Sequence, residues 1–214
     1  MTTLLLVRHG VTAANLLGYW QGWEETRLTP AGVRQAEAVA RRIAAEFAPA
    51  AVYSSTLRRA AQTAEPIALA AGCPLIRCEG LREINFGEVS GLTIPEFRAR
   101  FPGLFEAWTD KTNLDFQWPG GESRRDFFTR VWGAMDAIIA AHPSDEVVVV
   151  GHGGSLRAAL AHLLPERFTE WWLYELGNTS LTVVDMGASG TTLRVLNDRA
   201  HLAPKQPNLH NAES

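Results

Sequence analysis

Apolar and polar residues alternate along the 214-residue chain with two periods, one typical of strands and one typical of helices. Short, nearly continuous apolar runs predict buried strands at 3–7, 50–55, 74–78 and 146–151. Longer segments with apolar residues every three or four positions predict helices at 28–47, 56–72, 121–142 and 156–164. Two more strands are expected at 179–186 and 191–198, joined by a turn around GASG. This alternation predicts an α/β fold with three layers, α/β/α, whose mostly parallel central sheet has helices on both faces.

Local signals refine three of these helices. The first has Thr29 as a plausible N-cap and Pro30 in its first turn, and its apolar stripe is Val33, Ala36, Val39, Ala40 and Ile43. Pro66 lies inside the second helix and is expected to kink it or to mark a break. The stretch GGES is interpreted as the start of the third helix, where Glu122 favours the dipole of the first turn.

The periodicity is lost between Glu79 and Gly121, where Gly, Pro, Trp and Phe are frequent and a single short helix is expected at 93–102. A long irregular connection inside a compact domain is usually functional, so we interpret residues 88–121 as a lid. The prediction is one domain over 1–202 that carries this lid, followed by a loose tail at 203–214. Its aromatic residues, Trp20, Trp23, Trp108, Phe116 and Trp118, could pack the lid or contact a substrate.

Composition excludes several classes of protein. With 46% hydrophobic residues the chain can bury a full core. Its 20 Lys and Arg against 23 Asp and Glu give a formal charge of −3, so no long-range attraction to nucleic acid or to an anionic membrane is expected. No apolar run reaches the roughly 20 residues of a membrane span, and the N-terminus lacks the layout of a signal peptide. Cys73 and Cys78 are expected to be reduced, and the protein is predicted to be cytoplasmic.

Two predicted strands end in a histidine followed by glycine, in VRHG at His9 and in VGHGGS at His152. Ligands bind beyond the carboxyl ends of parallel strands, so the two imidazoles could face each other there. A zinc site is one option, but it needs further ligands, and the remaining histidines lie in helices or in the tail. The available neighbours are instead arginines, which bind phosphate by paired hydrogen bonds: Arg8, Arg58 and Arg59. The glycines at 151, 153 and 154 allow close backbone approach beside a helix N-terminus, which favours a phosphoryl group over zinc.

Five blocks in order along the chain resemble the histidine phosphatase superfamily, the phosphoglycerate mutase-like clan. They are VRHG with Asn15 six places beyond His9, QGW…LTPAGVRQA, SSTLRRAAQTA, LREINFGEVSG and VVGHGGSLRAAL, and they span about Leu4 to Leu164. The resemblance implies a phosphoglycerate mutase-like fold. It also implies catalysis through a phosphohistidine, with no metal or other cofactor.

The resemblance implies a role for each matching position. His9 is the nucleophile and Glu83 the proton donor. Arg59, directly before Ala60, is the phosphate-binding arginine of the block SSTLRRAAQTA. The phosphate pocket is completed by Arg8, Asn15 and His152, and the implied substrate and phosphate contacts also include Gln21, Gly22 and Gly153. In this mechanism a neutral His9 attacks phosphorus, a carbonyl fixes its tautomer, and Arg8, Arg59 and a protonated His152 hold the oxygens. Glu83 gives a proton to the leaving oxygen and then takes one from water.

Departures from the mutase pattern favour a phosphatase. Ile84 and Phe86 stand where mutases have Arg and Tyr, and Gly154 stands where they have Asn. Val11, Glu25 and Arg27 depart from the usual phosphatase residues as well, which leaves the substrate open.

We therefore predict hydrolysis of a small phosphorylated metabolite, with a cofactor-dependent phosphoglycerate mutase as the alternative. A non-catalytic relative that binds phosphorylated ligands is an alternative of another class. All five catalytic positions are intact, which speaks against such a relative. The segment FTEWWLYEL offers apolar surface for a homodimer, and Trp171 and Trp172 within it are expected in the core or at an interface.

Overall fold

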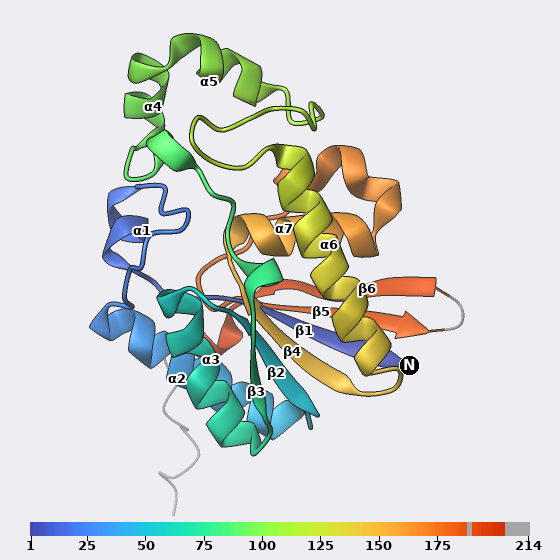
Figure 1. Ribbon diagram of the computed structural model, residues 1–214. Helices are drawn as coiled ribbons and strands as arrows, with labels where there is room; N and C mark the ends of the chain where they lie inside the picture. Colours follow the sequence, from blue (N-terminus) through green and yellow to red (C-terminus); the bar gives the residue numbers. More distant parts are fainter. Residues whose placement is uncertain (188–189, 204–214) are drawn as a thin grey trace, which may run out of the picture.

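The computed structural model describes residues 1–187 and 190–203, and its centre is a six-stranded sheet in the order β3-β2-β4-β1-β5-β6 (Figure 1). The strands are β1 (Thr2–Arg8), β2 (Ala51–Ser55), β3 (Leu75–Cys78), β4 (Glu146–Gly151), β5 (Leu181–Gly187) and β6 (Gly190–Asp198). Strands β1 to β4 are parallel, whereas β5 runs antiparallel to its neighbours β1 and β6. The predicted mostly parallel sheet is confirmed. The centre of the predicted GASG turn and the predicted tail from residue 204 lie outside the described residues.

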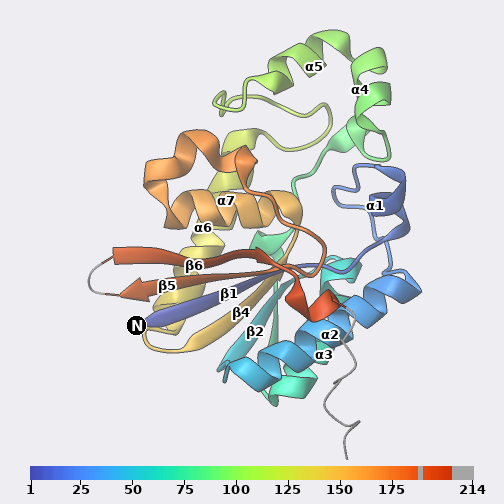
Figure 2. The same cartoon turned by 180° about the vertical axis from the view of Figure 1, so that it is seen from behind.

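Helices cover both faces of this sheet (Figures 1 and 2). Helices α2 (Pro30–Glu46) and α3 (Arg58–Ala71) pack on one face, and α6 (Arg124–Ala141) and α7 (Gly153–Leu163) pack on the other. Within β1, Leu5 and Val7 join the first layer, while Leu4 and Leu6 join the second. Because both faces of β1 are buried, its sequence is a continuous apolar run. The short helices are α1 (Ala13–Leu17), η1 (Glu79–Leu81), η2 (Gly87–Val89), η3 (Pro165–Leu173) and η4 (Ala200–Leu202).

One detail of the predicted helices is wrong, and one of the two alternatives expected at Pro66, a break, is excluded. Val33 is 42% exposed, because the inward position in the first turn of α2 belongs to Gly32, whose backbone packs against Val11. Pro66 does not break α3, which continues to Ala71. The loss of one backbone hydrogen bond at Pro66 is offset by the buried face of the helix, where Ile67 is fully inaccessible.

The lid segment, residues 88–121, stands above the carboxyl ends of the parallel strands and contains two helices, α4 (Ile94–Arg100) and α5 (Pro102–Thr109) (Figure 1). One helix was expected there, but the chain turns at Phe101 and Pro102 begins the second. Phe97 is 0% exposed at the centre of an aromatic cluster that holds the lid together. Its ring lies 5.4 Å from that of Trp20, so the loop after α1 supplies part of the lid core.

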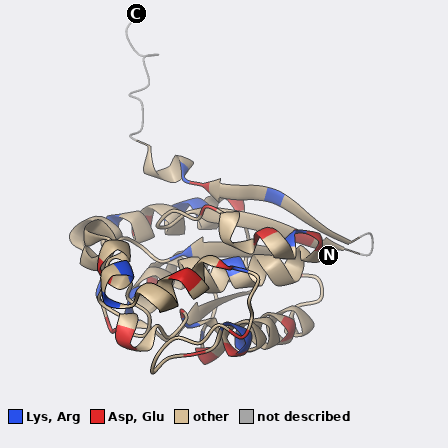
Figure 3. Cartoon of the chain, turned by 90° about the horizontal axis from the view of Figure 1, so that it is seen from above, with Lys and Arg blue, Asp and Glu red and all other residues tan. Residues whose placement is uncertain are grey.

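Three general expectations can be compared with the structure. Seen from above, Lys and Arg are interspersed with Asp and Glu over the helices and loops (Figure 3). In the described part of the chain, no helix combines the length and the apolar character that crossing a membrane requires. Cys73 and Cys78 are free thiols.

Candidate active site

Two imidazoles and two guanidinium groups meet at the carboxyl ends of neighbouring strands. The register of β1 on β4 places Arg8 opposite Gly151, so His9 and His152 follow the two strands side by side. Their ring centroids lie 5.2 Å apart, and their exposed fractions are 3% and 0%. Arg59, in the first turn of α3 after β2, is 1% exposed. The predicted convergence of these residues therefore exists, and it is buried.

His9 is oriented by its own loop. Its Nδ1 lies 2.7 Å from the carbonyl oxygen of Gly10, so Nδ1 carries the proton and Nε2 keeps its lone pair. Burial, and then the charges of Arg59 and Arg8, lower the pKa of His9 well below its ordinary value. The ring is therefore a neutral nucleophile. The loop needs glycine at position 10, because a Cβ there would lie 2.5 Å from the carbonyl oxygen of Gly32.

His152 lies behind His9 and differs from its predicted state. Burial, then the charges of Arg59 and of His9, lower its pKa well below the ordinary value, so it is neutral rather than protonated. Its Nε2 lies 2.8 Å from Ser55 Oγ, which also accepts a hydrogen bond from the backbone N–H of Leu57. Nδ1 of the same ring is buried without a partner among the described residues.

Arg8 and Arg59 are held by carbonyl oxygens rather than by carboxylates. Arg8 Nη1 donates to Leu176 O at 2.6 Å, and Arg59 donates to Glu24 O and Gly22 O, both at 2.8 Å. Burial lowers the pKa of Arg59 to about 10, which leaves it charged at neutral pH. Neither guanidinium forms an ion pair within the described ranges, and the Nε of each is buried without a partner. Two uncompensated cations with free donors form an anion site.

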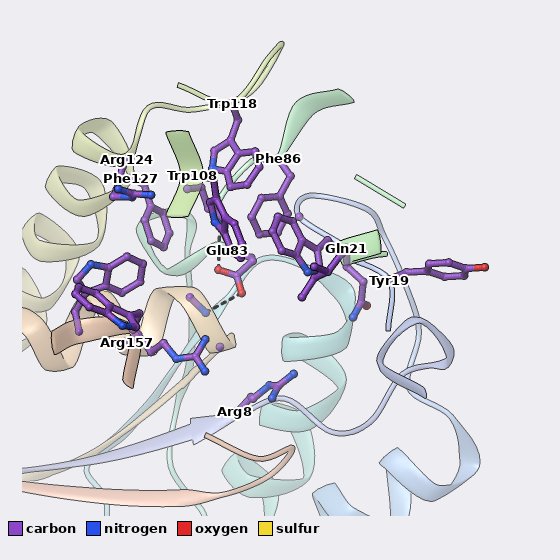
Figure 4. Close-up of a pocket in the computed structure, with 18 of the residues that line it drawn as sticks. Arg8, Tyr19, Gln21, Glu83, Phe86, Trp108, Trp118, Arg124, Phe127 and Arg157 are labelled. Atoms are coloured by element: carbon purple, nitrogen blue, oxygen red, sulfur yellow. Dashed lines mark hydrogen bonds between the residues drawn. The ribbon is translucent and has the colours of Figure 1, made fainter. Parts of the chain in front are cut away.

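Glu83 enters this site from the segment between η1 and η2. Its Oε2 accepts from the N–H of Gly154 at 2.9 Å and its Oε1 accepts from the N–H of Ile84 at 3.0 Å. In Figure 4 the carboxylate lies between Arg8 below and the rings of Phe86, Trp108 and Trp118 above. Position 154 must be glycine for this contact, because a Cβ there would overlap Glu83 Oε1 and lie 3.0 Å from its Cδ.

A cavity of about 370 Å³ extends from the two arginines to the lid. Seven of the predicted site residues line it: Arg8, His9, Gln21, Gly22, Arg59, Glu83 and Gly153. His152 does not line it, but its ring packs against that of His9 at an interplanar angle of 57°. Asn15 is also absent from the lining, and its Oδ1 accepts from the backbone N–H of Thr12 at 3.1 Å in the cap of α1. Arg58 is exposed at the surface, which leaves Arg59 as the arginine of this block.

Other lining residues were not predicted as site residues: Lys111, Arg124, Arg157, Trp171 and Trp172. Arg157 follows Gly153 by one helical turn, and that spacing was an available signal. A Cβ on Gly153 would lie 3.8 Å from Arg8 Nε and 4.0 Å from Arg157 Nη1, so the two guanidinium groups flank it. Trp171 and Trp172 line the cavity, and Trp171 also packs against the hydrophobic core, whereas Trp23 and Phe116 do not line the cavity.

The described residues contain no group of three or more His, Cys, Asp or Glu side chains that could hold a metal ion. The site therefore presents a neutral imidazole nucleophile, free cationic donors and one carboxylate within a single cavity. That combination suits the transfer of a phosphoryl group to a side chain, with a carboxyl group available for proton transfer.

Comparisons with known proteins extend over almost the whole chain. A family model described as the histidine phosphatase superfamily (branch 1) matches residues 4–199. Phosphoserine phosphatase 1 of Hydrogenobacter thermophilus is 31% identical over 213 residues, covering 99% of this chain and all of that protein. A metal-independent phosphoserine phosphatase of Arabidopsis thaliana is 35% identical over 205 residues, covering 95% of this chain and 84% of that protein. Phosphoglycerate mutases also match, at 36% identity over 191 residues and 85% of this chain for Brucella melitensis, with 90% of that protein covered.

Solved structures agree with this similarity. A phosphoserine phosphatase of Entamoeba histolytica in complex with phosphoserine superposes with a TM-score of 0.81 at 30% identity, covering 95% of this chain and all of that one. The same enzyme in complex with 3-phosphoglyceric acid gives a TM-score of 0.80.

Proposed function

The chain belongs to the histidine phosphatase superfamily, as its sequence blocks predicted, and we propose that it hydrolyses a small acidic phosphomonoester through a phosphohistidine at His9. Similarity to phosphoserine phosphatases over nearly the full length favours the predicted phosphatase over the mutase. One observation carries the mechanism. The free Nε2 of a neutral His9 lies in the same cavity as two arginines without ion pairs and the carboxyl group of Glu83.

The reaction proceeds in two displacements. His9 Nε2 attacks phosphorus and the ester P–O bond breaks, while Arg8 and Arg59 bind the phosphoryl oxygens and His152 packs against the His9 ring. Glu83, protonated, gives its proton to the leaving alkoxide. A water molecule then attacks the phosphohistidine, its proton passes to the Glu83 carboxylate, and inorganic phosphate leaves. The bond from His9 Nδ1–H to Gly10 O keeps Nε2 aimed at the phosphorus throughout.

The charge of the cavity defines the class of substrate. Five basic side chains line it, Arg8, Arg59, Lys111, Arg124 and Arg157, against the single carboxylate of Glu83. A phosphoryl group uses the first two. Arg124 Nη1 donates to the carbonyl oxygens of Asp110 and Asn113, Arg157 Nε donates to Tyr174 O, and Lys111 Nζ donates to Trp108 O. Each of the three keeps further N–H donors for a second anionic group. Phosphoserine and 3-phosphoglyceric acid, which the Entamoeba enzyme binds, both carry a carboxylate. We assign that recognition chiefly to Arg157, beside Arg8.

Matched substrates test this proposal. Phosphoserine is compared with phosphoethanolamine, in which hydrogen replaces the carboxylate, and 3-phosphoglycerate with glycerol 3-phosphate, in which a neutral hydroxymethyl group replaces it. A charge-assisted contact is worth about 1.5–3 kcal/mol, so kcat/KM should favour the acidic member by about 10- to 150-fold. Arg157→Met should remove that preference. Equal rates within each pair would refute the acidic class.

Three controls separate the alternatives. His9→Ala should abolish phosphate release, and acid-labile phosphate should be trapped on the wild type but not on this variant. Interconversion of phosphoglycerates without phosphate release would identify a mutase, and the absence of any turnover would identify a binding protein. A chelator should leave the rate unchanged, whereas a zinc hydrolase would lose activity.

We further propose that the protein acts in the cytoplasm, where Cys73 and Cys78 stay reduced; their free thiols are consistent with this. Homodimerisation through the segment FTEWWLYEL stays a prediction. Trp171 and Trp172 face the cavity, and Leu173, 58% exposed, is the apolar side chain that the segment presents outward. Sedimentation of the purified protein measures the oligomeric state.

A further inference from the structure

Arg130, in the second turn of α6, uses all five N–H donors of its guanidinium group. Nε and Nη2 donate to the two carboxylate oxygens of Glu122 at 2.8 and 2.9 Å. Nη1 donates to Gly80 O at 2.9 Å and to Arg82 O at 3.0 Å. The second N–H of Nη2 donates to Glu83 O at 3.2 Å. An arginine side chain has five such donors, so none is left for solvent or substrate.

The ion pair of Arg130 with Glu122 thereby holds one short segment, residues 80–85, by hydrogen bonds to its backbone. Glu122 Oε2 also accepts from the backbone N–H of Asn85 at 2.8 Å. Between Gly80 and Asn85, four backbone groups are thus bound by this single pair. The pair is only 21% and 16% exposed, so solvent screens it less than a surface pair.

The carbonyl group of Glu83 is held twice. Besides Arg130, the indole Nε1 of Trp23 donates to Glu83 O at 2.8 Å. Residues 82–86 lie in neither helix nor strand, so no regular ladder of hydrogen bonds fixes them. The position of the Glu83 side chain therefore depends on these contacts at its backbone and on the two N–H groups at its carboxylate.

We propose that Arg130 is a positioning residue. Together with Glu122 and Trp23, it holds Glu83 at the oxygen of the leaving group. This inference rests on the proposed function, in which Glu83 is the proton donor. Arg130 does not line the cavity and touches no substrate. Its contribution is geometric, since a misplacement of about 1 Å in a catalytic group can cost on the order of a hundredfold in rate.

Dependence on the leaving group distinguishes this role from general stability. An alkoxide needs a proton as it leaves, whereas p-nitrophenolate leaves without one. The test compares kcat/KM for an alkyl phosphate and for p-nitrophenyl phosphate, because this constant reports formation of the phosphoenzyme. Arg130→Met should lower the alkyl value at least about tenfold, within the range that general acid catalysis supplies. The aryl value should change much less.

A second variant and a control complete the design. Trp23→Phe removes one donor to Glu83 O from a side chain that is 38% exposed, and it should give the same selective loss, but smaller. Arg125→Met, on the same helix, removes an arginine whose side chain is 56% exposed and pairs with Asp115 on the surface. It should change neither value.

The outcomes separate two failures. If Glu83→Gln lowers kcat/KM equally for the alkyl and the aryl phosphate, Glu83 is not the proton donor and the assignment of its role is wrong. A second outcome is that Glu83→Gln lowers kcat/KM only for the alkyl phosphate, while Arg130→Met lowers it equally for both substrates or for neither. In that case the positioning role is wrong and the proposed function stands. If Arg130→Met does not fold, the ratio of the two values in Trp23→Phe decides the question alone.

Discussion

Replacing Gly154 by alanine should separate the activity of this protein from its stability. Gly154 is the second residue of α7, and its φ lies outside the left-handed region, so alanine fits the backbone. The new Cβ would overlap Oε1 of Glu83 and lie 3.0 Å from its Cδ. These atoms are the far end of a side chain. We therefore expect the carboxyl group to move while the helix stays in place.

The magnitude follows from the bond that is lost. Glu83 Oε2 accepts from Gly154 N at 2.9 Å, and a hydrogen bond between neutral groups, as for the protonated proton donor, is worth about 0.5–1.5 kcal/mol. If the carboxyl group keeps its place in the transition state through this bond, kcat/KM for an alkyl phosphate should fall about 2- to 13-fold. The loss in stability is offset by the higher helix propensity of alanine, about 1 kcal/mol above glycine. The melting temperature should therefore shift by only about 3 °C.

The assay pairs steady-state kinetics with thermal unfolding. Gly133→Ala is the matched control, because Gly133 lies in α6 with nothing within 4 Å of an added Cβ, and it should leave kcat/KM unchanged. Full activity in Gly154→Ala would show that docking of Glu83 on α7 is not needed for catalysis. A large drop in melting temperature would show that the helix, and not Glu83, gives way.

Three further predictions concern the lid and the titration of buried groups. Phe97→Ala should lower the free energy of unfolding in urea by about 3–5 kcal/mol, because this ring is 0% exposed in the lid core. The pKa values of His9 and His152 are lowered in the folded state, so the unfolded chain takes up more protons below pH 6.5. The free energy of unfolding should fall with pH below that value, by up to about 1.4 kcal/mol per pH unit for each imidazole, and His152→Gln should reduce the slope. Burial, and then Arg124, lower the pKa of Lys111 to about 7, so its charge is lost as pH rises through 7. The KM for a carboxylated substrate should therefore rise above pH 7, and Lys111→Arg should abolish the rise.

The sheet and its covering helices could be predicted because burial sets the spacing of apolar residues along each strand and helix. Leu4 to Val7 form a continuous apolar run since both faces of β1 are covered, and the stripe of α2 is apolar since it has one core-facing side. The error at Val33 arose where backbone packing replaced side-chain packing. Gly32 takes the inward position without any apolar side chain to mark it.

The lid could not be predicted in the same way. Its core is a set of aromatic rings that meet from distant positions, such as Phe97 on α4 and Trp118 beyond α5, 5.5 Å apart, with Trp20 from the loop after α1. Such a cluster has no period along the chain. That Trp171 and Trp172 line the cavity could not be predicted for a similar reason, because an apolar residue that lines a cavity has the same composition signal as one in the core.

The site residues could be predicted, whereas the groups that hold their side chains in place could not. His9 was indicated by its place at the end of a predicted strand, whereas Arg59 and Glu83 were assigned through the resemblance to the family. The groups that hold them are mostly backbone carbonyls, such as those of Gly10 and Gly22. Every residue has a backbone carbonyl group, so the sequence does not show which carbonyl groups accept hydrogen bonds from a buried cation.

Glu122 illustrates how a local interpretation fails. Taken alone, a carboxylate next to a helix start is stabilised by the helix dipole, which is worth at most about 1 kcal/mol at an exposed site. The structure instead offers it a bidentate arginine and a backbone N–H, a stronger combination. Arg130 lies seven residues after Ser123, the N-cap, which is two helical turns and therefore on the same side of α6. That spacing could have indicated the pair, but nothing in it points to residues 80–85, because their contacts with the pair are made by backbone groups alone. The positioning of Glu83 thus follows from the folded structure and from no sequence motif.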